Sequence, residues 1–147
     1  MSIDDDVALL ERVPTLRLLG RDSLRMLAIG SEQRTIYSNE YLFRQGEAAD
    51  SGFVVQRGAF RIDDGAGAQT TAGPGTLIGE LALVVAMQRP SSATAMENST
   101  VIRIARSLFQ RVLESDPAAA RRLRDEFAAR TSQLASDILM AGAKLST

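Results

Sequence analysis

Two short segments of this sequence carry residues suited to binding an anion. In the first, Gly79-Glu80-Leu81-Ala82, a glycine separates an apolar run that ends at Ile78 from the start of a short predicted helix. The first amides of a helix have no acceptors inside it, and together with the helix dipole they attract a negative group. Gly79 would let a ligand approach the backbone, and the Glu80 carboxylate can accept hydrogen bonds from two sugar hydroxyls. Taken alone, the same segment also fits an ordinary helix start.

The second segment, Arg89-Pro90-Ser91-Ser92-Ala93-Thr94-Ala95, contains an arginine that could face the anion from its other side. A guanidinium group is planar, always charged and able to make paired hydrogen bonds to a phosphate. Pro90 favours an extended backbone at Arg89, and in an extended segment residues two apart share a face. Arg89 could therefore reach toward the same place as Ser91.

The composition excludes much of the remaining chemistry. The chain has 147 residues without cysteine or histidine, so it can form no disulfide, zinc finger, iron–sulfur cluster or histidine-based triad. A net charge of −1 provides no positive field for a polyanion, so nucleic acid is not an expected partner. The acidic runs Asp4–Asp6 and Asp63-Asp64 fall at a terminus and in a predicted turn, which is typical of solvated charge. We therefore expect no enzymatic activity and no metal site.

The hydrophobic period changes twice along the chain and divides it into three parts. Residues 1–34 have the apolar spacing of helices, residues 35–105 contain short strand-like runs, and residues 106–147 return to the helical period. Regularly spaced strands with turn residues between them are typical of a small antiparallel barrel or jelly roll. We predict one α+β domain, in which an antiparallel β-barrel of the double-stranded β-helix type is flanked by N-terminal helices and a long C-terminal helix.

Turn and cap residues predict where the helices and strands of the first two parts begin and end. Pro14 and Gly20 break the first part into two or three short helices, and Asp22, followed by Ser23, is a candidate cap for the one that carries Leu24 and Leu27. The polar stretch Gly65–Gly75 reads as a variable hairpin tip. The predicted strands are Ile36-Tyr37, Tyr41–Phe43, Phe53–Val55, Phe60–Ile62, Leu77-Ile78, Ala93–Ala95 and Val101–Ile104.

The third part predicts two helices. Ser107 is a candidate cap for the first, and Asp116-Pro117 reads as the cap and first residue of a long helix that runs to about Ala143. The apolar stripe of the long helix is spaced as in a coiled-coil seam. It could cover its own barrel or pair two subunits as a homodimer. The stripe consists of Leu123, Phe127, Leu134, Ile138 and Ala141.

Three motifs, in their order and spacing, resemble the cyclic nucleotide-binding domain family. They are Asn39–Gly58, Gly73–Leu83 and Arg89–Ala95, and the most specific part joins the run from Phe43 to Gly58 with Gly79–Leu83. The resemblance covers nearly the whole chain, and it implies a jelly roll that contains a phosphate-binding cassette. In such a cassette Glu80 would accept a hydrogen bond from the ribose 2′-hydroxyl. Backbone from Gly79, Leu81 and Ala82 would help to hold the cyclic phosphate, and Ser92 and Ala93 would close the site.

The sequence departs from the family pattern at the arginine that pairs with the phosphate. Counted back from Ala93-Thr94, this arginine falls on Ser91, whereas counted forward from Glu80 it falls on Arg89. The two alignments imply a longer loop between Leu83 and Pro90. Either Arg89 replaces the missing charge or the site lacks it, and the loss of one hydrogen bond to a charged group weakens binding by roughly tenfold to a hundredfold.

The resemblance therefore implies a non-catalytic module that binds cAMP or cGMP and couples binding to movement of its C-terminal helix. The alternative is a degenerate domain that has lost the nucleotide and serves in dimerisation or partner docking. A DNA-reading helix-turn-helix would need more chain than follows Gly142, so direct DNA binding is not expected. The N-terminus lacks the positive charge of a signal peptide, and the longest apolar run, Leu81–Met87, is too short to span a bilayer, which predicts a cytoplasmic protein.

Overall fold

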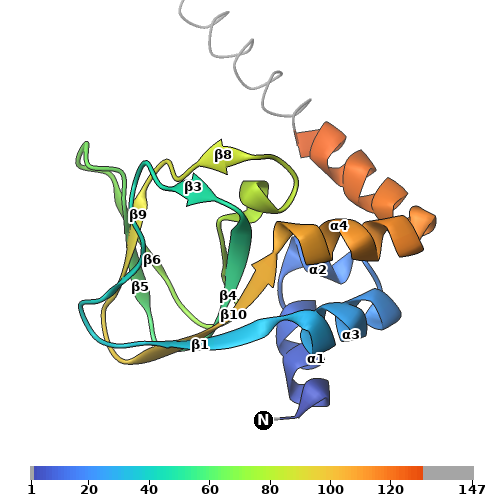
Figure 1. Cartoon of the computed structure of the whole chain (residues 1–147), viewed down its shortest axis with the longest axis horizontal. Coiled ribbons are helices and arrows are strands. Elements are labelled where there is room, and N and C mark those ends of the chain that lie inside the picture. Colours follow the sequence, from blue (N-terminus) through green and yellow to red (C-terminus); the bar gives the residue numbers. More distant parts are fainter. Residues whose placement is uncertain (1, 131–147) are drawn as a thin grey trace, which may run out of the picture.

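Antiparallel strands curl into a barrel beside a group of helices in the computed structural model of the chain (Figure 1), which describes residues 2–130. Three helices precede the strands: α1 (Ile3–Glu11), α2 (Pro14–Arg17) and α3 (Arg21–Gly30). The strands are β1 (Glu32–Ile36), β2 (Tyr41–Phe43), β3 (Ala48–Ala49), β4 (Ser51–Arg57), β5 (Phe60–Asp63), β6 (Gln69–Ala72), β7 (Leu77–Ile78), β8 (Met87–Gln88), β9 (Ser92–Ala95) and β10 (Ser99–Ala105). A short 3₁₀ helix, η1 (Glu80–Leu83), follows β7, and α4 (Arg106–Ser115) is followed by a helix over residues 117–130.

The strands form two four-stranded sheets and one two-stranded ladder, with every pairing antiparallel. The sheet orders are β1-β10-β4-β7 and β2-β9-β5-β6, and β3 pairs with β8. This arrangement confirms the predicted α+β fold with an antiparallel jelly roll. The helices gather at one end of the barrel, beside the sheet that contains β4 and β10 (Figure 1).

Each of the seven predicted runs overlaps a strand, but three strands were not predicted. Strands β3 and β8 are two residues long, which is too short for an alternating pattern. Strand β6 has the polar sequence Gln-Thr-Thr-Ala and lies inside the stretch Gly65–Gly75, which we expected to be a hairpin tip. It pairs residue by residue with β5, so the tip is confined to residues 64–68.

Two predicted helix caps were wrong and one is confirmed. Helix α3 starts one residue before Asp22, with Gly20 at its N-cap, so Asp22 lies in the first turn. Helix α4 follows β10 directly and has Ala105, rather than Ser107, at its N-cap. Asp116 does cap the last described helix, because its Oδ1 accepts a hydrogen bond from the Ala119 amide at 3.2 Å.

Two hydrophobic cores lie on opposite faces of the sheet that contains β4. Val54 faces the helices, whereas Phe53 and Val55 face the barrel interior, as expected from the alternation of side chains along a strand. The helix-side core includes Leu10, Leu16, Leu27 and Phe109. The barrel core includes Phe43, Phe60, Ala93 and Val101.

The described part of the C-terminal stripe covers this chain's own core. Leu123 is buried in the helix-side core, and Phe127 packs against that core. The remaining stripe residues, Leu134, Ile138 and Ala141, lie outside the described residues, so pairing of two subunits stays a prediction. None of the helices within residues 2–130 combines the length and the apolar character that a bilayer span requires.

Candidate functional site

A cavity of about 240 Å³ opens between the barrel and the segment around η1. Six of the eight residues predicted for the ligand site line it, namely Gly79, Glu80, Leu81, Ala82, Arg89 and Ser91. The other lining residues are mainly apolar: Phe43, Ala49, Ile62, Ile78, Met87 and Pro90. An apolar pocket with a few convergent polar groups is the usual form of a small-molecule site.

The two other predicted site residues do not line this cavity. Ser92 begins β9, and its Oγ accepts a hydrogen bond from the Gln45 amide at 2.8 Å. The next residue, Ala93, is fully buried in the barrel core. Their proposed part in closing the site stays a prediction.

Gly79 forms the turn between β7 and η1. Its φ of +78° lies in the left-handed region, which side chains other than glycine rarely adopt. A Cβ atom at this position would lie 2.6 Å from Nη1 of Arg89, so the absence of a side chain also makes room for the guanidinium group. The following element is a single 3₁₀ turn in which the Ala82 amide donates to the Gly79 carbonyl at 3.2 Å. That amide is therefore already used within the turn.

Arg89 points into the protein and is only 5% exposed. Its guanidinium carbon lies 4.2 Å from the centroid of the Phe43 ring and 5.5 Å from that of Phe53, which gives a cation–π arrangement. Nη2 donates to the Ser51 carbonyl at 2.9 Å and contacts the Ser51 hydroxyl at 3.3 Å. Among residues 2–130, no carboxylate lies within ion-pair distance of this guanidinium.

The first sequence motif fixes the backbone of Arg89. The Arg89 amide donates to the Glu47 carbonyl at 2.7 Å, and the Arg89 carbonyl accepts from the Gly46 amide at 2.8 Å. Gly46 has a φ of +90°, so it supplies the turn that brings β3 alongside β8. The segment with Gly46 and Glu47, before β4, therefore holds the backbone of Arg89, after η1, in place by hydrogen bonds.

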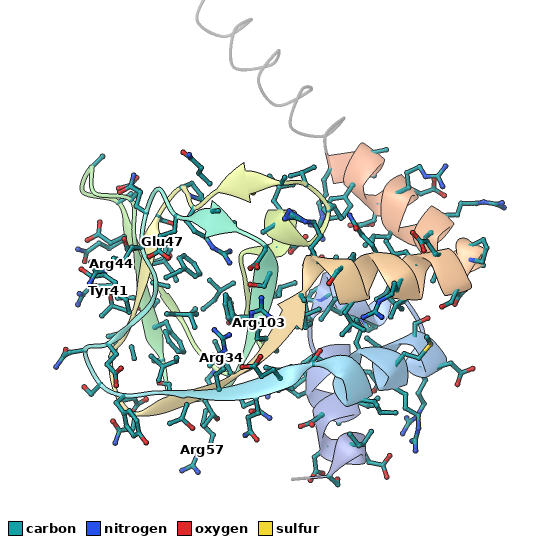
Figure 2. All side chains as sticks on the ribbon, in the orientation of Figure 1. Arg34, Tyr41, Arg44, Glu47, Arg57 and Arg103 are labelled. Carbon is teal, nitrogen blue, oxygen red and sulfur yellow. The ribbon has the colours of Figure 1, made fainter. Side chains whose placement is uncertain are left out.

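A second, polar hollow lies on the other side of Arg89, lined among others by Arg34, Glu47, Asp50 and Arg103. Figure 2 shows Arg34 and Arg103 beside β1 and β10, within the region enclosed by the strands. Arg103 makes an ion pair with Asp50 at 3.3 Å. Burial lowers the pKa of Arg89, and the charges of Asp50 and Glu47 oppose that shift. An arginine nevertheless remains protonated at neutral pH because its ordinary pKa is so high.

Glu80 makes contacts that the sequence did not predict. Its Oε1 accepts hydrogen bonds from the Thr15 hydroxyl at 2.9 Å and from Nη1 of Arg130 at 2.7 Å. Nη2 of Arg130 also donates to the Thr15 hydroxyl at 2.9 Å. These residues come from α2, η1 and the helix over residues 117–130, and no local pattern in the sequence connects them.

The family model described as the cyclic nucleotide-binding domain matches residues 33–116, which include the barrel except for the first residue of β1, the cavity and the whole of α4. The chain belongs to the cyclic nucleotide-binding domain family. It is 31% identical, over 84% of its length, to an uncharacterized NTE family protein of Mycobacterium tuberculosis, and 31% identical, over 74% of its length, to a cAMP-dependent protein kinase regulatory subunit of Eremothecium gossypii. The aligned regions cover only 23% and 24% of those two relatives.

Solved structures share the fold. A cyclic nucleotide-binding-like protein from Brucella abortus is 34% identical and superimposes with a TM-score of 0.67, over 76% of this chain and 99% of that one. The similarity therefore extends to almost the whole of that structure.

Proposed function

We propose that this chain is a non-catalytic regulatory module that binds a cyclic purine mononucleotide, cAMP or cGMP, in the cavity between Glu80 and Arg89. The observation that carries the proposal is the buried Arg89 guanidinium, which has no carboxylate at ion-pair distance within the described residues. Burying this charge is costly, the charges of Asp50 and Glu47 offset the cost only in part, and a bound phosphate would supply a negative charge in direct contact. Family membership supports the same ligand class.

The lining of the cavity suggests how such a ligand would lie. Arg89 would pair with the cyclic phosphate beside Gly79, and Glu80 would accept from the ribose 2′-hydroxyl. Backbone at Gly79 and Leu81 would lie close to the phosphate. Apolar side chains such as Ile62 and Met87 would contact the sugar and the base.

Binding would act through the C-terminal helix. Arg130, on the helix over residues 117–130, donates a hydrogen bond to Glu80, which lines the cavity. The position of this helix and the ligand site are therefore physically connected. A ligand can shift this helix only by the difference in its affinity for two arrangements. A cytoplasmic location, a homodimer formed through the helix and an effector elsewhere in a longer protein belong to the same proposal.

Calorimetric titration with cAMP and with cGMP tests the proposal. We expect binding of at least one nucleotide, and a Glu80→Ala variant should bind it about tenfold to a hundredfold more weakly because a charge-assisted hydrogen bond is lost. Glu97→Ala, at an exposed carboxylate outside the cavity, is the matched control and should leave the affinity unchanged. Absence of heat and of any thermal shift with both nucleotides would favour the alternative interaction module.

A further inference from the structure

Thr15, Glu80 and Arg130 form a closed network of hydrogen bonds between three separate elements. Each residue contacts the other two, at distances between 2.7 and 2.9 Å. Thr15 is only 2% exposed, so this network reaches from the surface into the interior of the domain. Its hydroxyl donates to Glu80 and accepts from Arg130, which uses both of its hydrogen-bonding roles.

Both bonds to Glu80 end on the same carboxylate oxygen. Oε1 accepts from Thr15 and from Arg130, whereas Oε2 accepts no hydrogen bond from residues 2–130. A carboxylate offers about four acceptor sites on its two oxygens. Glu80 also lines the cavity, so it can contact a ligand without losing its two protein partners.

Arg130 is itself held in place by its own helix. Its Nε donates to Glu126 one turn earlier at 3.4 Å, and its guanidinium carbon lies 5.4 Å from the centroid of the Phe127 ring. Phe127 packs against the helix-side core. The position of the Arg130 guanidinium therefore depends on where this helix lies against the domain.

We propose that Thr15 and Arg130 are positioning residues that hold the Glu80 carboxylate for a sugar hydroxyl of the ligand. This inference rests on the proposed function, because it concerns how the same cavity selects its ligand. With Oε1 fixed by two donors, the Glu80 side chain occupies one rotamer before the ligand arrives, and a preorganised partner loses less entropy on binding. The preference for ribose over deoxyribose then depends on the position of the helix that carries Arg130.

Binding of cAMP and of 2′-deoxy-cAMP to the full chain, measured side by side by calorimetry, tests the proposal. The wild-type chain should bind cAMP with roughly tenfold or more higher affinity than 2′-deoxy-cAMP, because the deoxy form cannot make the hydrogen bond to the charged Glu80 carboxylate. Arg130→Gln and Thr15→Val should each reduce this preference to less than about threefold, mainly by weakening cAMP binding. Thr15→Ser keeps the hydroxyl and should retain the preference.

Arg124→Gln is the matched control, because Arg124 lies on the same helix and is exposed. It should leave both affinities unchanged. If both nucleotides weaken equally in Arg130→Gln and Thr15→Val, the network is only structural and the inference is wrong. Tighter cAMP binding by Arg130→Gln would also overturn it, because Arg130 would then compete with the ligand for Glu80. Failure of the unchanged chain to bind either nucleotide would overturn the proposed function itself.

Discussion

An Arg89→Ala variant is expected to bind cAMP about a hundredfold more weakly than the unchanged chain, or worse, while its barrel stays folded. The guanidinium is buried against Phe43 and Phe53 and is the cation that lines the ligand cavity on the side of Gly79. Removing one partner of a buried charge pair leaves the other without a counter-ion, which costs about 2–5 kcal/mol of binding free energy.

The fold should tolerate this change because Arg89 has no ion-pair partner within residues 2–130, so its removal leaves no carboxylate without a counter-ion. Its hydrogen bonds go to the carbonyl and hydroxyl of Ser51, and removing a buried charge relieves its desolvation. Calorimetry gives the affinity, and a thermal melt gives the stability. Arg57→Ala is the control, since Arg57 is exposed and points away from the barrel (Figure 2). Unchanged cAMP affinity in Arg89→Ala would contradict the assignment of the phosphate partner.

A Gly79→Ala variant should lose both stability and affinity. The φ of +78° strains any residue with a Cβ, and that Cβ would lie 2.6 Å from Nη1 of Arg89. The guanidinium would have to leave its contacts with Ser51. We expect the free energy of unfolding to fall by about 2 kcal/mol and cAMP affinity to fall with the displaced arginine.

The two causes can be separated by making the same change in an Arg89→Ala background. Without the guanidinium only the backbone strain remains, so the cost to the free energy of unfolding should drop to about 1 kcal/mol. Denaturant unfolding of the single and double variants measures this difference. Gly73→Ala is the control, because a Cβ there has no atom within 4 Å. An equal cost of Gly79→Ala in both backgrounds would show that the two residues do not interact.

Much of the fold could be predicted because the spacing of apolar residues along the sequence differs between its strands and its helices. The run Phe53–Val55 is apolar throughout, and the structure gives the reason: one face of β4 meets the barrel core and the other meets the helices. Strand β6 could not be predicted in this way, because its residues are polar and their extended conformation results from pairing with β5. Pairing partners are a property of the tertiary structure, which local propensity does not contain.

In the candidate site, too, residues adjacent in sequence could be predicted, whereas contacts made only by tertiary packing could not. Gly79 and Glu80 could be singled out because the turn and the carboxylate are adjacent in sequence. The choice between Arg89 and Ser91 depended on loop length, and the structure places both residues along the cavity with the guanidinium directed inward. Thr15 and Arg130 were missed because their contacts with Glu80 arise only when α2 and the last described helix pack beside η1.

A crystal structure of the chain grown with cAMP would test whether Arg89 and Glu80 bind the nucleotide. We expect the cyclic phosphate within hydrogen-bonding distance of the Arg89 guanidinium and the ribose 2′-hydroxyl on the Glu80 carboxylate. A structure with the cavity empty, or with the nucleotide bound away from Arg89, would contradict the assignment of this cavity as the nucleotide site.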